Sequence, residues 1–210
     1  MNLTQDEIRN LLKDIKKNQS ILLNIAAFDF PFMFESLINH PNVDINCELE
    51  HHASILFKCA DYHRVVLTFA QLMKHPKLNL KKQDSNGNTI LHKIIEEYYY
   101  DTYNTDWDSM LNMVLSHSDL NAIIDVPNNN NLKPINISED SESTEYLLSH
   151  GCSIEHDDLY CDNNDEESQI LIRQHYIQNI LKLLPGNIHY QFGNLNLSSD
   201  IINYILLPFL

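Results

Sequence analysis

A short sequence pattern returns along this chain at an interval of about 35 residues, and it constrains the fold more than any other feature. The pattern is a hydroxyl residue followed by Ile-Leu, and it starts at Ser20, Ser54 and Thr89, with a weaker copy, Lys-Pro-Ile-Asn-Ile, at Lys133. A second pattern is an apolar pair followed two residues later by histidine, and its histidines are His40, His75, His117 and His150. Two independent markers that share one interval predict tandem repeats of one local fold.

Each unit reads as a turn followed by two helices. The most complete copy spans residues 84–95, where Gly87 supplies the backbone freedom of a tight turn and Thr89 can cap a helix. Leu91, Ile94 and Ile95 follow at helical spacing. Each marker histidine is followed by Pro, Ser or Gly, which indicates the end of the second helix. A short extended segment is then predicted at residues 43–46, 78–80, 120–121 and 153–154.

The order Asp-x-x-Gly-x-Thr-x-Leu-His in residues 84–92 resembles the start of an ankyrin repeat, a unit of about 33 residues. The resemblance implies an all-α fold, an ankyrin-repeat solenoid of about four helix-turn-helix repeats with short turn fingers. The repeats are expected near residues 18–47, 48–82, 83–124 and 125–157. The resemblance also implies that His92 hydrogen-bonds to backbone and fixes neighbouring turns. The chain departs from the family pattern where Ile21, Ile55 and Ile90 replace Pro and where Leu23 and Phe57 replace His, which indicates divergence.

The two ends of the chain are expected to cap the repeats. Thr4 and Glu7 form a capping box for an N-terminal helix within residues 1–17. Residues 158–210 are expected to hold an acidic linker and a helical C-terminal cap, in which Ser168 caps one helix. The final helix is expected over residues 200–206. The sequence Leu-Ser-Ser-Asp-Ile-Ile-Asn-Tyr-Ile-Leu at residues 197–206 resembles the first helix of an F-box. That resemblance implies a ubiquitin-ligase adaptor as an alternative function. Because Ser198 replaces the usual Pro of that box, we prefer the interpretation of an apolar capping helix.

The third repeat carries about seven extra residues. The helix-start marker and the histidine lie 20, 21, 28 and 17 residues apart in the four repeats, so the insertion falls within residues 97–109 and the fourth repeat has a shortened first helix. The insertion is rich in Tyr and Trp, which are enriched at interface hot spots. Tyr98 and Tyr99 either prolong the helix or join the loop. The partner-binding candidates are the aromatic residues expected to be exposed there and two residues of the polar loop at 128–131: Tyr100, Tyr103, Trp107, Asn129 and Asn130.

Charge and cysteine content exclude several classes of partner. The net charge of −15 disfavours nucleic acid and anionic membrane surfaces, because both bind clustered Lys and Arg. Eleven acids lie between Glu139 and Glu167 with no basic residue among them, which suits a solvated face better than a site for a basic partner. None of the four cysteines forms a Cys-x-x-Cys pair, so we expect free thiols in an intracellular protein. Neither a secretion signal nor a membrane-spanning stretch is expected.

No residue pattern indicates catalysis. The marker histidines are expected to donate to the last carbonyls of their helices, which is a structural role. His51 and His52 are adjacent and lack further ligands at suitable spacing, so neither a metal nor any other cofactor is expected. There is no Gly-rich phosphate loop and no nucleophile signature, and the paired acids Asp157 and Asp158 are expected to be solvated.

The expected function is therefore non-enzymatic protein–protein interaction through the concave face of turns and first helices and through the aromatic insertion. The composition suggests a bacterial or viral effector that acts in a eukaryotic host cell. Besides the ubiquitin-ligase adaptor, the remaining alternative is an enzyme whose chemistry lies in the C-terminal segment.

Overall fold

The computed structural model describes residues 26, 31–41, 43–47, 54–60, 65–100, 105–161 and 165–183. Within them the chain is helical and contains no β-strand, so the all-α prediction is confirmed. The helices are α3 (Pro31–Ile38), α4 (Ile55–Ala60), α5 (Val66–Met73), α6 (Ile90–Tyr100), α7 (Thr105–Leu115), α8 (Ser141–Ser149) and α9 (Glu166–Leu183), with short 3-10 helices η2 (Leu120–Ala122), η3 (Pro134–Ile137) and η4 (His156–Tyr160). In this described part, no helix combines the length and apolar character needed to cross a membrane.

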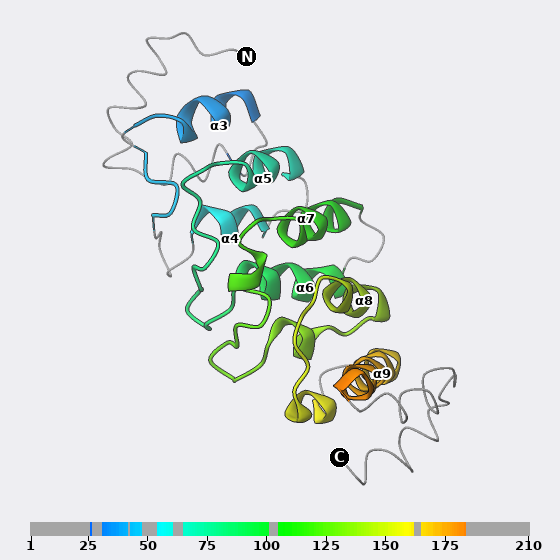
Figure 1. Ribbon diagram of the computed structural model, residues 1–210. Helices are drawn as coiled ribbons and strands as arrows, with labels where there is room; N and C mark the ends of the chain where they lie inside the picture. Colours follow the sequence, from blue (N-terminus) through cyan, green and yellow to red (C-terminus); the bar gives the residue numbers. More distant parts are fainter. Residues whose placement is uncertain are drawn as a thin grey trace. The chain divides into compact units, whose positions relative to one another are not determined.

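The chain divides into two units, Met1–Pro134 and Ile135–Leu210. In the first unit α3 packs against α5 and α5 against α7, which places these three helices in one row, while α4 and α6 form a second row beside it (Figure 1). Each helix of one row also packs against its neighbour in the other, α4 against α5 and α6 against α7. The core between the rows is apolar and is formed by fully buried side chains such as Phe34, Leu56, Phe69, Leu91 and Met110.

The helices begin and end at the two sequence markers. α4 begins directly after Ser54, α6 directly after Thr89 and η3 directly after Lys133. At the other end, the backbone N–H of each marker histidine donates to the carbonyl three residues earlier, over 3.0, 2.9, 3.1 and 3.2 Å for His40, His75, His117 and His150. These predicted boundaries are confirmed. The Ser20 marker and the Thr4–Glu7 capping box lie outside the described residues.

The lengths of the first helices differ as the sequence predicts. α6 has 11 residues and α4 has 6, whereas the segment that follows Lys133 is the 4-residue η3. Part of the insertion therefore prolongs α6, which ends at Tyr100. Tyr98 and Tyr99 have helical backbone, and the expectation that Tyr100 lies in a loop is wrong.

One predicted extended segment is helical. Residues 120–121 belong to η2, because Leu120 is followed by Ile123 and Ile124, and all three side chains are buried. Only a helical turn brings positions i, i+3 and i+4 to one face. The N–H groups of Ile123 and Ile124 both donate to the carbonyl of Leu120, at 2.9 and 3.0 Å.

The second unit corrects two expectations about the acidic region. Asp158 is only 7% exposed; its side chain accepts hydrogen bonds from Asn136 Nδ2 at 3.0 Å and from the backbone N–H of Glu155 at 2.7 Å. Residues 156–160 form the 3-10 helix η4, which packs on α9. Of the paired acids Asp157 and Asp158, only Asp157 is exposed. A buried carboxylate is stable there because hydrogen bonds replace its hydration.

The cap of α9 is Asp165 and not Ser168. The Asp165 side chain accepts the backbone N–H of Ser168 at 2.8 Å, three residues into the helix, which is the geometry of an N-cap. Ser168 is buried in the first turn. Asp140 caps α8 in the same way, accepting the N–H of Ser143 at 2.7 Å.

Candidate interaction surface

The turn before α6 is closed by the side chain of Asp84. Its Oδ1 accepts the backbone N–H of Asn86 at 2.8 Å and that of Asn88 at 2.9 Å. The N–H of Gly87 donates to the carbonyl of Asp84 at 3.0 Å, and Gly87 has φ +76°. This left-handed conformation favours glycine, which accounts for Gly87 in the sequence pattern.

The turn before η3 has the same hydrogen bonds, 44 residues later. Asn128 takes the place of Asp84, and its Oδ1 accepts the N–H of Asn130 at 2.9 Å and of Leu132 at 3.1 Å. Asn131 takes the place of Gly87; its N–H donates to the carbonyl of Asn128 at 2.9 Å, and its φ is +60°. Asparagine tolerates this conformation better than most residues. The two segments form one turn structure built with different side chains.

Direct hydrogen bonds join these two turns. The backbone N–H of Asn129 donates to the carbonyl of Asn86 at 2.9 Å, and Asn129 Nδ2 donates to the carbonyl of Ser85 at 3.0 Å. Asn128 Nδ2 donates to Asn88 Oδ1 at 2.9 Å. Asn129 lies so close to Gly87 that a Cβ there would approach Asn129 Oδ1 to 2.5 Å. The side chain of Asn129, a predicted partner-binding residue, is therefore engaged in holding the turns together.

Asn86 and Asn130 occupy equivalent positions at the tips of the two turns. Each follows the closing residue of its turn by two, and both are exposed. Within the described part of the chain, neither side chain makes a hydrogen bond. The paired turns therefore present both tips to solvent, beside the exposed residues Ser85, Asn129 and Asn131.

His92 links α6 to the second turn. Its Nδ1 accepts from Thr89, from the backbone N–H at 3.2 Å and from the hydroxyl at 2.9 Å, which leaves the proton on Nε2. Nε2–H donates to the carbonyl of Leu132 at 2.9 Å. The side chain is fully buried, and burial lowers the pKa of His92 more than the Leu132 carbonyl and Asp84 raise it. The turn-fixing role predicted for His92 is confirmed by these contacts.

A second pair of turns lies further toward the N-terminus. Asn46 Nδ2 donates to the carbonyl of Lys77 at 2.6 Å, and Asn46 Oδ1 accepts the N–H of Asn79 at 2.8 Å. Each turn is closed by its own side chain, since Asp44 accepts the N–H of Asn46 at 2.9 Å and Asn79 accepts that of Lys81 at 3.1 Å. Among the described residues of the first unit, pairing between successive turns thus occurs twice.

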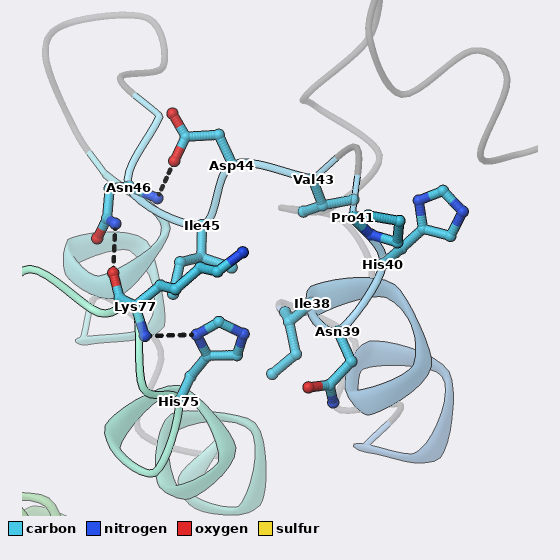
Figure 2. Close-up of a pocket in the computed structure, with 10 residues that line it drawn as sticks. All are labelled: Ile38, Asn39, His40, Pro41, Val43, Asp44, Ile45, Asn46, His75 and Lys77. Carbon is cyan, nitrogen blue, oxygen red and sulfur yellow. Dashed lines mark hydrogen bonds between the residues drawn. The ribbon is translucent and has the colours of Figure 1, made fainter.

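A pocket of about 90 Å³ lies beside this second pair of turns (Figure 2). Its apolar wall comes from Ile38, Val43 and Ile45, while Asp44 and Lys77 line it from opposite turns. The end of α3 and the marker histidines complete its lining, which consists of Ile38, Asn39, His40, Pro41, Val43, Asp44, Ile45, Asn46, His75 and Lys77.

Two of the marker histidines, His75 and His117, act differently from the expectation. His75 Nδ1 accepts the backbone N–H of Lys77 at 3.2 Å, and His117 Nδ1 accepts that of Asp119 at 3.1 Å. These two rings therefore hold the turn after the helix. Nδ1 of His150 donates to a helix carbonyl as expected, to that of Tyr146 at 2.7 Å. At His75 and His117 the backbone N–H two residues later donates to Nδ1, so this nitrogen cannot itself donate to a helix carbonyl.

The structure describes the side chain of one aromatic candidate, Trp107. Trp107 is 2% exposed, so its expected exposure is wrong. It begins the buried stripe of α7, followed by Met110, Leu111, Val114 and Leu115. These positions share one face of a helix, and the sequence contained this signal. Tyr103 lies outside the described residues, and Tyr100 is described only by its helical backbone.

In the described residues no group of three or more His, Cys, Asp or Glu side chains is arranged to hold a metal ion. No disulfide joins the four cysteines. Comparison with protein families and with curated proteins finds no match.

Proposed function

We propose that this chain is a non-enzymatic protein-binding module built from ankyrin-like repeats, with its turns as the main contact surface. The observation that carries the proposal is that one hydrogen-bonded turn occurs at residues 84–88 and again at 128–132, with direct bonds between the two copies. Helix boundaries at the repeat markers support the same reading. An array of this kind presents side chains at fixed spacing, which suits binding to an extended partner surface.

The proposed contact surface is narrower than the sequence alone suggests. Asn86 and Asn130 are exposed at equivalent positions of rigid turns, so ordering them on binding costs little conformational entropy. The side chain of Asn129 is engaged in the bond between the turns and Trp107 is buried, so neither is proposed as a contact. Tyr103 stays in the proposal as part of the aromatic insertion, on the strength of its residue type.

The proposed setting is the inside of a eukaryotic host cell, where a divergent repeat protein of bacterial or viral origin would act as an effector. This rests on composition and analogy. The ubiquitin-ligase adaptor depends on residues beyond Leu183, which lie outside the described residues. The enzyme alternative places its chemistry in the segment after Ile154, of which residues 155–161 and 165–183 are described. No observation on the described chain favours either of them.

The test compares partner capture by matched surface variants. The tagged protein and its Asn86→Arg/Asn130→Arg variant are used to capture proteins from eukaryotic cell lysate, followed by quantitative mass spectrometry. The control is Asn112→Arg, an exposed position on α7, away from the turns. Loss of captured proteins from the turn variant alone supports the proposal. Equal capture by all three proteins contradicts a role of these turns.

A further inference from the structure

The turn after α5 is basic in an otherwise acidic protein. Residues 74–82 contain Lys74, Lys77, Lys81 and Lys82, four of the 14 basic residues of a chain with net charge −15, and no acid interrupts them. Lys74, Lys77 and Lys81 are exposed, and their ammonium groups form no ion pair with another described residue. Clustered like charges repel one another, so a ligand that supplies carboxylates is favoured here.

The pocket beside this basic turn provides an apolar contact. Ile38 and Ile45 are each 3% exposed and form its wall together with Val43. Its volume of about 90 Å³ is that of roughly three water molecules, which suits a short aliphatic side chain such as Val or Leu. Lys77 extends along this wall, so its charge lies beside the apolar part of a pocket that polar side chains also line (Figure 2).

The backbone of Lys77 is fixed on both sides. Its N–H donates to His75 Nδ1 at 3.2 Å, and its carbonyl accepts Asn46 Nδ2 at 2.6 Å (Figure 2). Asn46 is in turn positioned by Asp44, which accepts its backbone N–H at 2.9 Å. A ligand meeting Lys77 therefore finds a preformed site and spends little free energy on ordering the turn.

We propose that this pocket and the lysines beside it bind an acidic peptide segment of the partner protein, with a short aliphatic side chain in the pocket and carboxylates on Lys77 and Lys81. The inference rests on the proposed protein-binding function and adds the chemistry of the partner. The apolar wall favours a peptide over a phosphate chain, and the net charge of −15 opposes an extended polyanion. The carboxylate of Asp44 lines the same pocket and weakens binding of an acidic ligand.

The test begins with selection of peptides from a random phage-displayed library on the purified full chain. The expected result is enrichment of sequences in which Asp or Glu flanks a Val, Leu or Ile. Synthetic copies are then measured by fluorescence anisotropy, where affinity should fall as salt rises. Selection of basic or uncharged sequences, or no enrichment at all, overturns the proposal.

Charge variants locate the site. Lys77→Glu/Lys81→Glu should weaken binding at least about tenfold, and Asp44→Asn, which keeps the accepting oxygen, should strengthen it about two- to fivefold. The control Lys182→Glu changes the net charge at an exposed position of α9 in the other unit and should have little effect. Equal losses in the control and the turn variant would show a non-specific charge effect and overturn the site.

The two proposals fail differently. In one outcome, the selected peptides bind Lys77→Glu/Lys81→Glu as well as wild type but no longer bind Asn86→Arg/Asn130→Arg. This outcome rejects the pocket as the peptide site and supports the turns as the contact surface. Binding of a uridylate oligonucleotide or of phosphatidylserine vesicles in place of the peptides rejects both.

Discussion

His92 Nε2 donates to the carbonyl oxygen of Leu132 at 2.9 Å, across 40 residues of sequence. The same ring accepts from Thr89 at the start of its own helix. One buried side chain therefore fixes both the beginning of α6 and the end of the turn before η3. The geometry of the proposed contact surface depends on this link, because Asn130 lies within the turn that His92 holds.

Replacing His92 should strongly destabilise the first unit. His92→Ala leaves the Thr89 N–H without its partner and creates a cavity. It also removes one of the two hydrogen bonds to the Leu132 carbonyl, which still accepts the Asn128 N–H. We therefore expect a loss of about 2–4 kcal/mol in the free energy of unfolding. The chain has a single tryptophan, Trp107, which is buried in this unit. Urea denaturation followed by Trp107 fluorescence measures the effect. A loss below about 0.5 kcal/mol would contradict the structural role.

Because of His92, the free energy of unfolding of the first unit should also fall as the pH is lowered. Because its pKa is lowered in the folded state from the value of 6.5, the unfolded chain binds more protons between these two pKa values. Stability is therefore complete above about pH 6.5 and decreases as the pH falls below it, by at most about 1.4 kcal/mol per pH unit for one group. The measurement is the difference between wild type and His92→Gln at several pH values, which cancels the other histidines. Parallel curves would exclude His92 as the cause.

Gly87 should tolerate substitution less well than Gly151. Both have left-handed backbone, with φ of +76° and +85°, so alanine costs about 1–2 kcal/mol at either position. A Cβ at Gly151 meets nothing within 4 Å, whereas at Gly87 it would approach the backbone nitrogen of Asn129 to 2.7 Å. We expect Gly87→Ala to cost about 1–3 kcal/mol more than Gly151→Ala in thermal unfolding followed by circular dichroism. Equal costs would show that the two turns separate easily.

Local chemistry made much of this architecture predictable. The turn at Gly87 and the start of α6 at Thr89 depend on neighbouring residues, so both could be inferred from residue type and position. The role of His92 could be inferred from the resemblance to an ankyrin repeat. The copy of the turn at residues 128–132 was expected only as a polar loop, because asparagine replaces both the aspartate and the glycine of the first copy. Its equivalence appears only in the hydrogen bonds.

The sequence does not reveal which side chains are buried through contacts with residues far away in the chain. Asp158 is buried because Asn136, 22 residues earlier, donates to it, and no local pattern reveals that partner. The predicted exposure of Trp107 is wrong for another reason. It relied on the polar neighbours Asp106 and Asp108 rather than on the helical spacing between Trp107 and Met110. In a helix, flanking residues point to other faces, so the spacing was the better guide.

Trp107 should therefore matter for stability. Trp107→Ala is expected to cost about 3–5 kcal/mol, because it empties the start of the buried face of α7. Trp107→Phe keeps an aromatic ring in the core and should cost less. Circular dichroism replaces tryptophan fluorescence as the probe for these variants. A Trp107→Ala protein as stable as wild type would contradict the burial.

The neighbouring residues Asn129 and Asn130 should separate stability from binding. Asn129→Ala removes the hydrogen bond from Nδ2 to the Ser85 carbonyl and should lower the free energy of unfolding by about 0.5–1.5 kcal/mol. Asn130→Ala removes only an exposed side chain, because the backbone N–H of residue 130 still donates to Asn128 Oδ1. The free energy of unfolding should therefore stay within about 0.5 kcal/mol of wild type. If the turn tips contact the partner, Asn130→Ala should instead reduce the amount of partner captured. The reverse pattern, an unstable Asn130→Ala and a stable Asn129→Ala, would contradict the assignment of Asn129 to the turn–turn contact and of Asn130 to the exposed tip.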